Sequence, residues 1–141
     1  MPEVDKSATV LRALLNKDFD QYKQLIQSLD RDEGRDFLRL VSTALLKMSD
    51  RKFGSGDVTT AVVEWVAKIR SESDVAAKAF DPVLSEQVLL FVLGKEDRQD
   101  LSGRQIRDAE LLLLPALVDD QGLDSAEIDE LLVSARALIR R

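Results

Sequence analysis

Apolar side chains recur at spacings of three and four residues along almost the whole chain, and this period is that of amphipathic α-helices. No stretch alternates apolar and polar residues for long enough to predict a β-strand. Capping residues and glycines divide the pattern into segments joined by short loops, which favour antiparallel neighbours. The sequence therefore predicts an all-α fold, a compact bundle of six to seven helices.

The expected helices follow from the caps. They cover about 7–16, 18–29, 32–52, 55 or 57 to 69, 82–93 and 102–121, with a last helix from 124 onwards. Two pairs have the spacing of a capping box, Ser102 with Gln105 and Asp124 with Glu127. The stretch 71–80 stays open between a connection and a single helical turn. Pro115 predicts a kink or break near Leu111–Leu114, because proline removes a backbone hydrogen bond and clashes with the preceding turn.

One segment differs from the others in being apolar nearly all round. It covers residues 83–93 and contains the run Val88–Leu93. A helix without a polar face is normally enclosed by its neighbours, so we expect this one at the centre of the bundle. The length of 141 residues is typical of one core, which predicts a single domain over residues 1–141.

The absence of histidine and cysteine removes most catalytic chemistry. It excludes imidazole acid–base catalysis, thiol nucleophiles, disulfides and zinc sites with His or Cys ligands. The acidic residues around Gly122 do not fit a calcium-binding loop, since Leu117 and Ile128 occupy its first and last ligand positions. We therefore expect no enzyme activity, no metal and no cofactor, although a carboxylate-dependent enzyme stays a third alternative.

The negative charge is concentrated in the second half of the chain. Residues 1–70 carry 12 basic and 11 acidic side chains, whereas residues 71–141 carry 8 basic and 15 acidic ones. In this second half an acidic patch surrounds Gly122, and the candidate partner-binding residues of the patch are Asp119, Asp120, Asp129 and Glu130. Such a field favours a basic partner and disfavours nucleic acid. The expected function is a protein-interaction or regulatory module, in its narrower form an acidic adaptor or an immunity-type protein.

The alternative function uses a basic stripe in the third helix. Its cations recur at multiples of four residues, and the candidate partner- or anion-binding residues are Arg35, Arg39, Lys47 and Arg51, with Arg31 one turn earlier. A row of this kind can bind phosphates, which indicates a nucleic-acid-associated regulator. A row of this kind is more often a solvated outer face, and Asp32 and Asp36 are available here for local pairing.

The remaining expectations concern location and assembly. The first residues, Met1-Pro2-Glu3-Val4-Asp5-Lys6, lack the basic start and apolar stretch of a signal peptide, so a cytoplasmic location is expected. The leucine run Leu111–Leu114 presents apolar side chains in all directions, and a homodimer interface there is a further expectation.

Three short segments carry a general resemblance. They are Arg51-Lys52-Phe53-Gly54, Phe80-Asp81-Pro82 and Gly122-Leu123-Asp124, each in front of an apolar helix. With them the chain resembles small uncharacterised helical proteins of bacterial, actinobacterial type. The segments are caps and turns, so the resemblance implies a helical fold and carries over no activity and no functional residue.

Overall fold

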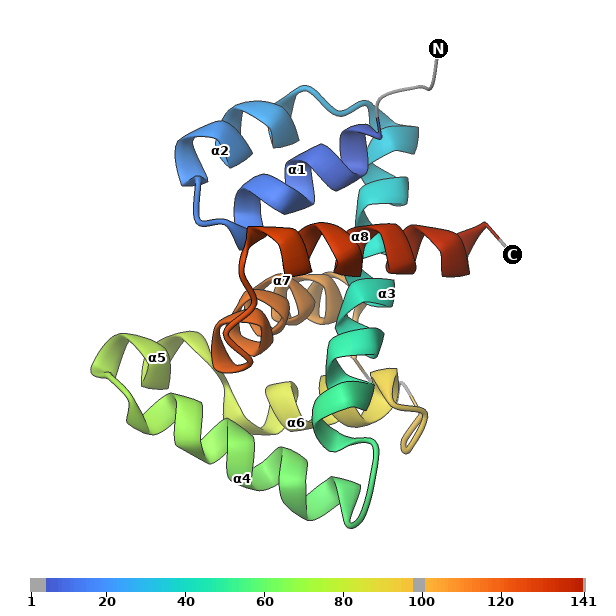
Figure 1. Ribbon diagram of the computed structural model, residues 1–141. Helices are drawn as coiled ribbons and strands as arrows, with labels where there is room; N and C mark the ends of the chain where they lie inside the picture. Colours follow the sequence, from blue (N-terminus) through green and yellow to red (C-terminus); the bar gives the residue numbers. More distant parts are fainter. Residues whose placement is uncertain (1–4, 98–100, 141) are drawn as a thin grey trace. The chain divides into compact units, whose positions relative to one another are not determined.

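The computed structural model describes residues 5–97 and 101–140, and these residues form eight α-helices and no strand (Figure 1). The helices are α1 (Lys6–Leu15), α2 (Phe19–Gln27), α3 (Arg31–Phe53), α4 (Val58–Ser71), α5 (Asp74–Ala79), α6 (Pro82–Val92), α7 (Gly103–Asp120) and α8 (Ser125–Ile139). The all-α prediction is confirmed, and the predicted count of six to seven helices is too low by one or two. The additional helix is α5, which begins after the N-cap Ser73. It lies within residues 71–80, for which the sequence allowed either a connection or a single helical turn.

The chain divides into two compact units. Unit 1 comprises Met1–Ala44 and Val118–Arg141, and unit 2 comprises Leu45–Leu117. Unit 1 contains α1, α2, α8 and the first part of α3. Unit 2 contains α4, α5, α6, the last part of α3 and most of α7. The single domain over residues 1–141 stays a prediction.

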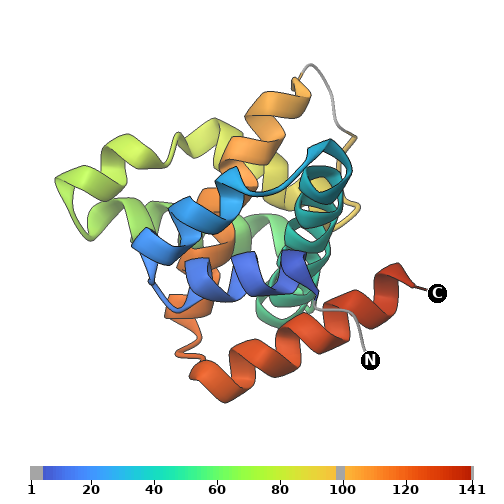
Figure 2. The same ribbon diagram turned by 90° about the horizontal axis from the view of Figure 1, so that it is seen from above.

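In unit 1, α1 lies between α2 and α8, as two perpendicular views show (Figures 1 and 2). Helices α1 and α8 are antiparallel. The start of α1 contacts the end of α8, and the end of α1 contacts the start of α8. At the latter end, the Ser125 hydroxyl donates to the Asn16 side chain over 3.0 Å. The apolar face of α8 is buried, with Ile128, Leu131, Leu132 and Ala135 each at most 3% exposed.

In unit 2, α4 packs against α5 and α6. The rings of Phe53 and Trp65 meet edge to face, 5.7 Å apart. The Arg70 guanidinium donates to the backbone carbonyls of Phe80, over 2.8 Å, and of Ala77, over 3.2 Å. One arginine therefore ties the short helix α5 and its end to α4, which explains how six residues can hold a helical conformation.

Helix α6 is less enclosed than its sequence suggested. Val88, Leu89 and Leu90 are buried, but Val83 is 60% exposed. The expectation for residues 83–93, burial on nearly all sides, is therefore wrong for the start of this helix. Only one side of α6 is buried, and its main packing partner within unit 2 is α4.

The local capping predictions are confirmed. Ser102 and Gln105 exchange hydrogen bonds at the start of α7, as Asp124 and Glu127 do at the start of α8. A third reciprocal pair, Asp30 with Glu33, begins α3 slightly earlier than predicted. The prediction near Leu111–Leu114 was a kink or a break, and the break does not occur, because α7 continues through Pro115 from Gly103 to Asp120. Burial of Leu113, Leu114 and Leu117 offsets the hydrogen bond that the proline removes.

Gly54 ends α3 at a point with no room for a side chain. A Cβ atom there would lie 2.3 Å from the Asp50 carbonyl oxygen, a backbone atom that has to move. At Gly34, within α3, a Cβ atom would meet nothing within 4 Å. We expect Gly54→Ala to lower the free energy of unfolding by roughly 1–2 kcal/mol. Gly34→Ala should raise it by about 0.5–1 kcal/mol, because alanine is the better helix former.

Urea denaturation of the two alanine variants measures both effects. Glycine-to-alanine substitution at the two ends of α3 is thus expected to change the free energy of unfolding in opposite directions. Equal stabilities of the two variants would contradict the crowding at Asp50.

Candidate functional site

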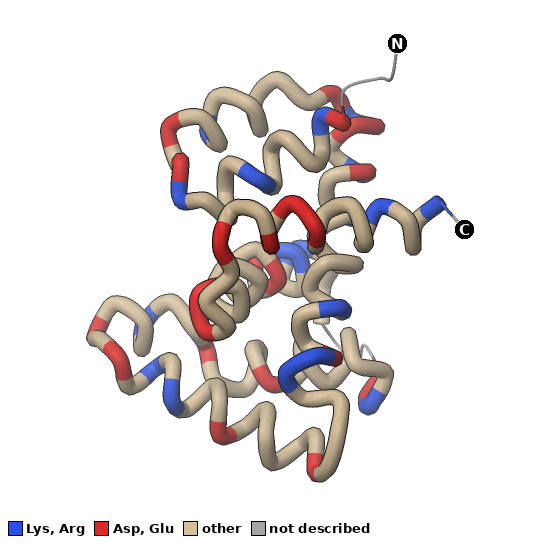
Figure 3. Tube along the Cα trace, in the orientation of Figure 1, with Lys and Arg blue, Asp and Glu red and all other residues tan. Residues whose placement is uncertain are grey.

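The predicted acidic patch lies on unit 1, at the end of α7 and the start of α8. Asp119, Asp129 and Glu130 are exposed and Asp120 is half-buried. Asp124 and Glu127 add two exposed carboxylates, and both take part in the capping box. In Figure 3 acidic positions follow one another along the first turns of α8, and basic positions appear only toward its end. Asp119 and Asp120 are thus the last residues of α7, and Asp129 and Glu130 follow in the first turns of α8.

Two cations from the α1 region lie against this patch. The Arg12 guanidinium pairs with the Asp129 carboxylate, and Lys17 Nζ lies 3.3 Å from an oxygen of Asp119. All four side chains are more than two-fifths exposed, so these pairs are solvated and contribute little to stability. Glu130 forms no ion pair with any residue in the described ranges 5–97 and 101–140.

The predicted basic stripe is found on α3, and its members belong to different units. Arg31, Arg35 and Arg39 are exposed in the part of α3 that lies in unit 1. Lys47, which is half-buried, and Arg51, which is exposed, belong to unit 2. The expected local pairing with Asp36 does not form, because that carboxylate turns to another partner.

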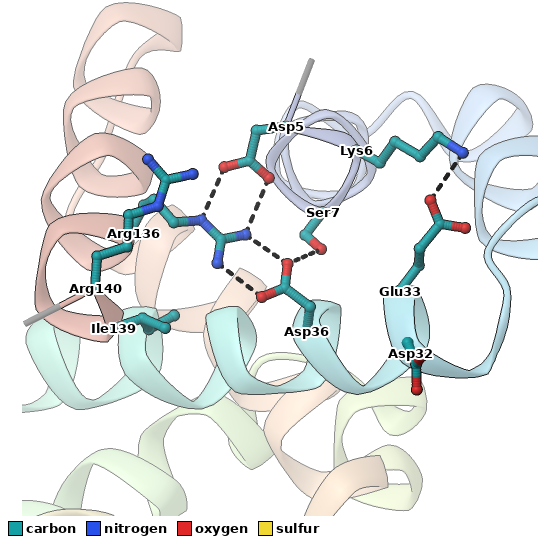
Figure 4. A pocket seen from close by; sticks show the side chains of 9 residues that line it. All are labelled: Asp5, Lys6, Ser7, Asp32, Glu33, Asp36, Arg136, Ile139 and Arg140. Carbon is teal, nitrogen blue, oxygen red and sulfur yellow. Dashed lines mark hydrogen bonds and ion pairs between the residues drawn. The ribbon is translucent and has the colours of Figure 1, made fainter. Parts of the chain in front are cut away.

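That partner is Arg136 of α8, which lies between two aspartates from distant parts of the chain (Figure 4). Its Nε and Nη2 donate to the Asp5 carboxylate over 2.9 and 3.0 Å. Its Nη1 and Nη2 donate to the Asp36 carboxylate over 2.8 and 2.7 Å. The Ser7 hydroxyl adds a hydrogen bond of 2.6 Å to Asp36. We call Asp5, Ser7, Asp36 and Arg136 the arginine cluster.

Each member of the arginine cluster is placed by its helix. Asp5 is the N-cap of α1, and one of its oxygens also accepts the backbone N–H of Ala8 over 3.0 Å. Arg136 follows the buried Ala135 in the last turn of α8, with only 12% of its side chain exposed. Asp36 precedes the buried Phe37 in α3. The cluster therefore joins α1, α3 and α8 of unit 1 through two bidentate pairs, the strongest kind of ionic hydrogen bond.

The pairing shifts the acidity of all three charged groups. Hydrogen bonds from Arg136, with a further one from Ser7, lower the pKa of Asp36 from 3.8 to about 2. Burial acts to raise the pKa of Asp5, but hydrogen bonds from Arg136 and the Ala8 N–H outweigh it and lower this pKa. The two carboxylates raise the pKa of Arg136. All three groups are thus held in their charged forms.

A shallow pocket of about 650 Å³ opens beside the arginine cluster. Its lining includes the cluster together with Lys6, Asp32, Glu33, Ile139 and Arg140. Lys6 Nζ lies 2.8 Å from a carboxylate oxygen of Glu33 (Figure 4). The cluster supplies no acid or base near neutral pH, since the pKa of both half-buried carboxylates, Asp5 and Asp36, is lowered and the Ser7 hydroxyl donates its hydrogen bond to Asp36. The arginine cluster is built to hold helices together.

The sequence pattern did not reveal this cluster. The signal was weak, because Asp5, Asp36 and Arg136 are separated by 31 and 100 positions and each has an adequate local explanation. A polar residue directly beside a buried apolar one, as at Asp36 and Arg136, is the only hint that the sequence offers.

A second hollow runs between α1 and α8. It is a groove of about 390 Å³, and its lining includes the apolar residues Ala8, Leu132, Val133 and Ala137 and the arginines Arg12, Arg136 and Arg140. Asp5 is its only carboxylate among the described residues, and Arg136 occupies both oxygens of that group. The groove thus combines apolar and basic residues at the surface of unit 1.

The leucine run predicted as a dimer interface is mostly internal. Leu113 and Leu114 are fully buried, and Leu112 is 43% exposed. A homodimer through Leu111–Leu114 stays a prediction, with Leu112 as its most exposed side chain. The stretch contributes to the folded interior, which accounts for most of its apolar character.

Membrane spans and metal sites are both absent from the described part of the chain. No helix within residues 5–97 and 101–140 is long and apolar enough to cross a membrane. Over the same residues, no three carboxylates approach closely enough to form a metal site. Comparison with protein-family models, with curated proteins and with solved structures found no match for this chain.

Proposed function

We propose that the chain is a non-enzymatic protein-interaction module whose acidic surface binds a basic protein. The acidic surface consists of the carboxylates at the end of α7 and the start of α8: Asp119, Asp120, Asp124, Glu127, Asp129 and Glu130. The observation that supports it is the excess of charge on this surface. Five of the six carboxylates are exposed, and two of these five pair with a cation, Arg12 or Lys17, which leaves a surplus of three exposed negative charges.

The exposure of these groups matters for recognition. Solvated pairs such as Arg12 with Asp129 exchange partners at little cost, so the carboxylates remain available to a partner. A surplus of one sign also steers an oppositely charged partner and raises its association rate. The proposed partner therefore presents a surface rich in lysine and arginine.

Hydrogen bonds hold both ends of the helix that carries most of this surface. The capping box of Asp124 and Glu127 fixes the start of α8, and the arginine cluster fixes its end to α1 and α3. A preorganised surface loses less entropy on binding than a mobile one. The narrower form of the proposal is an adaptor or immunity-type protein that covers the basic functional surface of its partner.

Neutralising the acidic surface is expected to weaken capture of the partner at least tenfold, about 1.4 kcal/mol. The variant combines Asp119→Asn, Asp120→Asn, Asp129→Asn and Glu130→Gln. Its control removes the same number of negative charges, all of them exposed, in unit 2 through Glu64→Gln, Glu72→Gln, Asp74→Asn and Asp97→Asn. The measurement is affinity capture from a lysate of the source cells, with nuclease treatment and at two salt concentrations, followed by mass spectrometry.

Three results are informative. A single basic protein that persists after nuclease treatment, binds the control and is lost with the acidic-surface variant supports the proposal. Equal capture of that protein by both variants contradicts it. Recovery of nucleic acid alone also contradicts it, and would favour the basic stripe of Arg35, Arg39, Lys47 and Arg51 as the binding surface.

A further inference from the structure

The outer face of α8 carries a second regular pattern. Its residues recur at alternating spacings of four and three and are all exposed: Ala126, Glu130, Val133, Ala137 and Arg140. Val133 in the middle is 71% exposed, the highest value of any large apolar side chain described in unit 1. The alternation of four and three is the spacing with which one helix packs along another in a coiled coil. This face has the geometry of a helix–helix contact.

The charges on this face are self-complementary. Glu130 and Arg140 lie five positions before and after Ala135, and neither forms an ion pair with another described residue. Helices rise by about 1.5 Å per residue, so each charge is roughly 7.5 Å from that midpoint along the axis. When two such helices run antiparallel about this midpoint, Glu130 of each faces Arg140 of the other. Val133 then faces Ala137.

We propose that this face binds a second copy of the chain, with the two α8 helices antiparallel about a twofold axis. A parallel arrangement would place Glu130 against Glu130 and Arg140 against Arg140, which is repulsive. In the antiparallel arrangement a large side chain, Val133, meets a small one, Ala137, so the helices can approach closely. Each contact occurs twice, as twofold symmetry requires.

The groove between α1 and α8 extends the contact. Val133, Ala137 and Arg140 form one side of this groove, and Ala8 and Arg12 of α1 contribute to the other. The α8 helix of a second copy, packed along this outer face, therefore also reaches the groove. Side chains from a ridge of that second helix enter the groove. Helix α8 lies at the margin of unit 1 with α1 along one side, which leaves the outer face accessible (Figure 2).

Charge reversal tests the arrangement directly. Glu130→Arg places two cations opposite each other, and Arg140→Glu places two anions opposite each other. Each variant alone should weaken self-association at least tenfold, measured as the dimer dissociation constant by analytical ultracentrifugation at low salt. An equimolar mixture of the two variants should associate as well as the wild-type chain, because every reversed charge then meets its opposite. Glu64→Arg, on an exposed position of α4, is the control and should leave self-association unchanged.

Other results would overturn the proposal. One is a wild-type chain that stays monomeric up to about 1 mM, the weak end of specific association. Another is self-association that persists in both single variants, or a mixture that fails to associate. This test requires no basic partner, so its outcome is independent of the captured protein in the test of the acidic surface. Val133→Ser should weaken the dimer without changing any charge, which separates the apolar contact from the ionic one.

Discussion

Replacing Arg136 with methionine is expected to lower the free energy of unfolding by about 2–3 kcal/mol. The change removes one cation and leaves the carboxylates of Asp5 and Asp36 facing each other without compensation. Removal of one partner from a fully buried ion pair costs about 3–5 kcal/mol. The expected loss is smaller here, because the side chains of Asp5 and Asp36 are 29% and 40% exposed.

Urea denaturation of the Arg136→Met variant measures this effect. The control is Arg35→Met, which removes an exposed cation of α3 without a described ion pair and should change stability by less than about 0.5 kcal/mol. Adding Asp36→Asn to Arg136→Met should recover part of the loss, because it removes one of the two uncompensated charges. An Arg136→Met variant as stable as the wild-type chain would show that the cluster contributes nothing to unit 1.

Acid should destabilise unit 1 between about pH 4 and pH 2. The pKa of Asp36 falls from 3.8 to about 2 on folding, and the pKa of Asp5 is also lowered. The folded state therefore binds fewer protons than the unfolded state, and the stabilisation is complete above pH 4. It is lost as the pH falls toward the folded-state pKa. A shift of this size corresponds to roughly 2 kcal/mol at most, reduced to about 1–2 kcal/mol because Asp36 is 40% exposed.

Urea midpoints recorded from pH 6 to pH 2 check this expectation. The Asp36→Asn variant should be less stable at pH 6 and should lose less stability than the wild-type chain on acidification, since asparagine does not titrate. Parallel curves for the two proteins would mean that other carboxylates cause the acid response. Glu64→Gln, which neutralises a solvated carboxylate of α4, is the control and should leave the wild-type curve unchanged.

The Arg136→Met variant and the acid response both affect the arginine cluster, which holds the helix that carries the proposed surfaces. The acidic surface and the outer face of α8 belong to the same helix, one at its start and the other along its exposed side. The arginine cluster fixes the end of that helix to α1 and α3. Loss of Arg136 should therefore weaken both proposed contacts indirectly, whereas Glu130→Arg affects them directly and leaves the helix in place.

The sequence by itself determined the features that depend on residues three or four positions apart. The all-helical architecture follows from the apolar period, and the starts of α7 and α8 follow from capping boxes whose two members are close in the chain. The exposure of Asp119, Asp129 and Glu130 was also predictable, because charged residues near the ends of amphipathic helices face solvent. Helix α5 was not, since its stability depends on Arg70, which bonds to the Ala77 and Phe80 carbonyls from another helix.

Only the tertiary structure decided where distant groups meet. Pro115 left α7 unbroken because buried leucines on both sides of it offset the lost hydrogen bond. Asp36 was available to several nearby arginines on its own helix, yet it pairs with Arg136, one hundred positions away. The physical reason is that a local pair on a solvated helix face gains little, whereas a bidentate pair shielded by packed helices gains much more. Which faces pack, and hence which pairs are shielded, is a property of the folded chain.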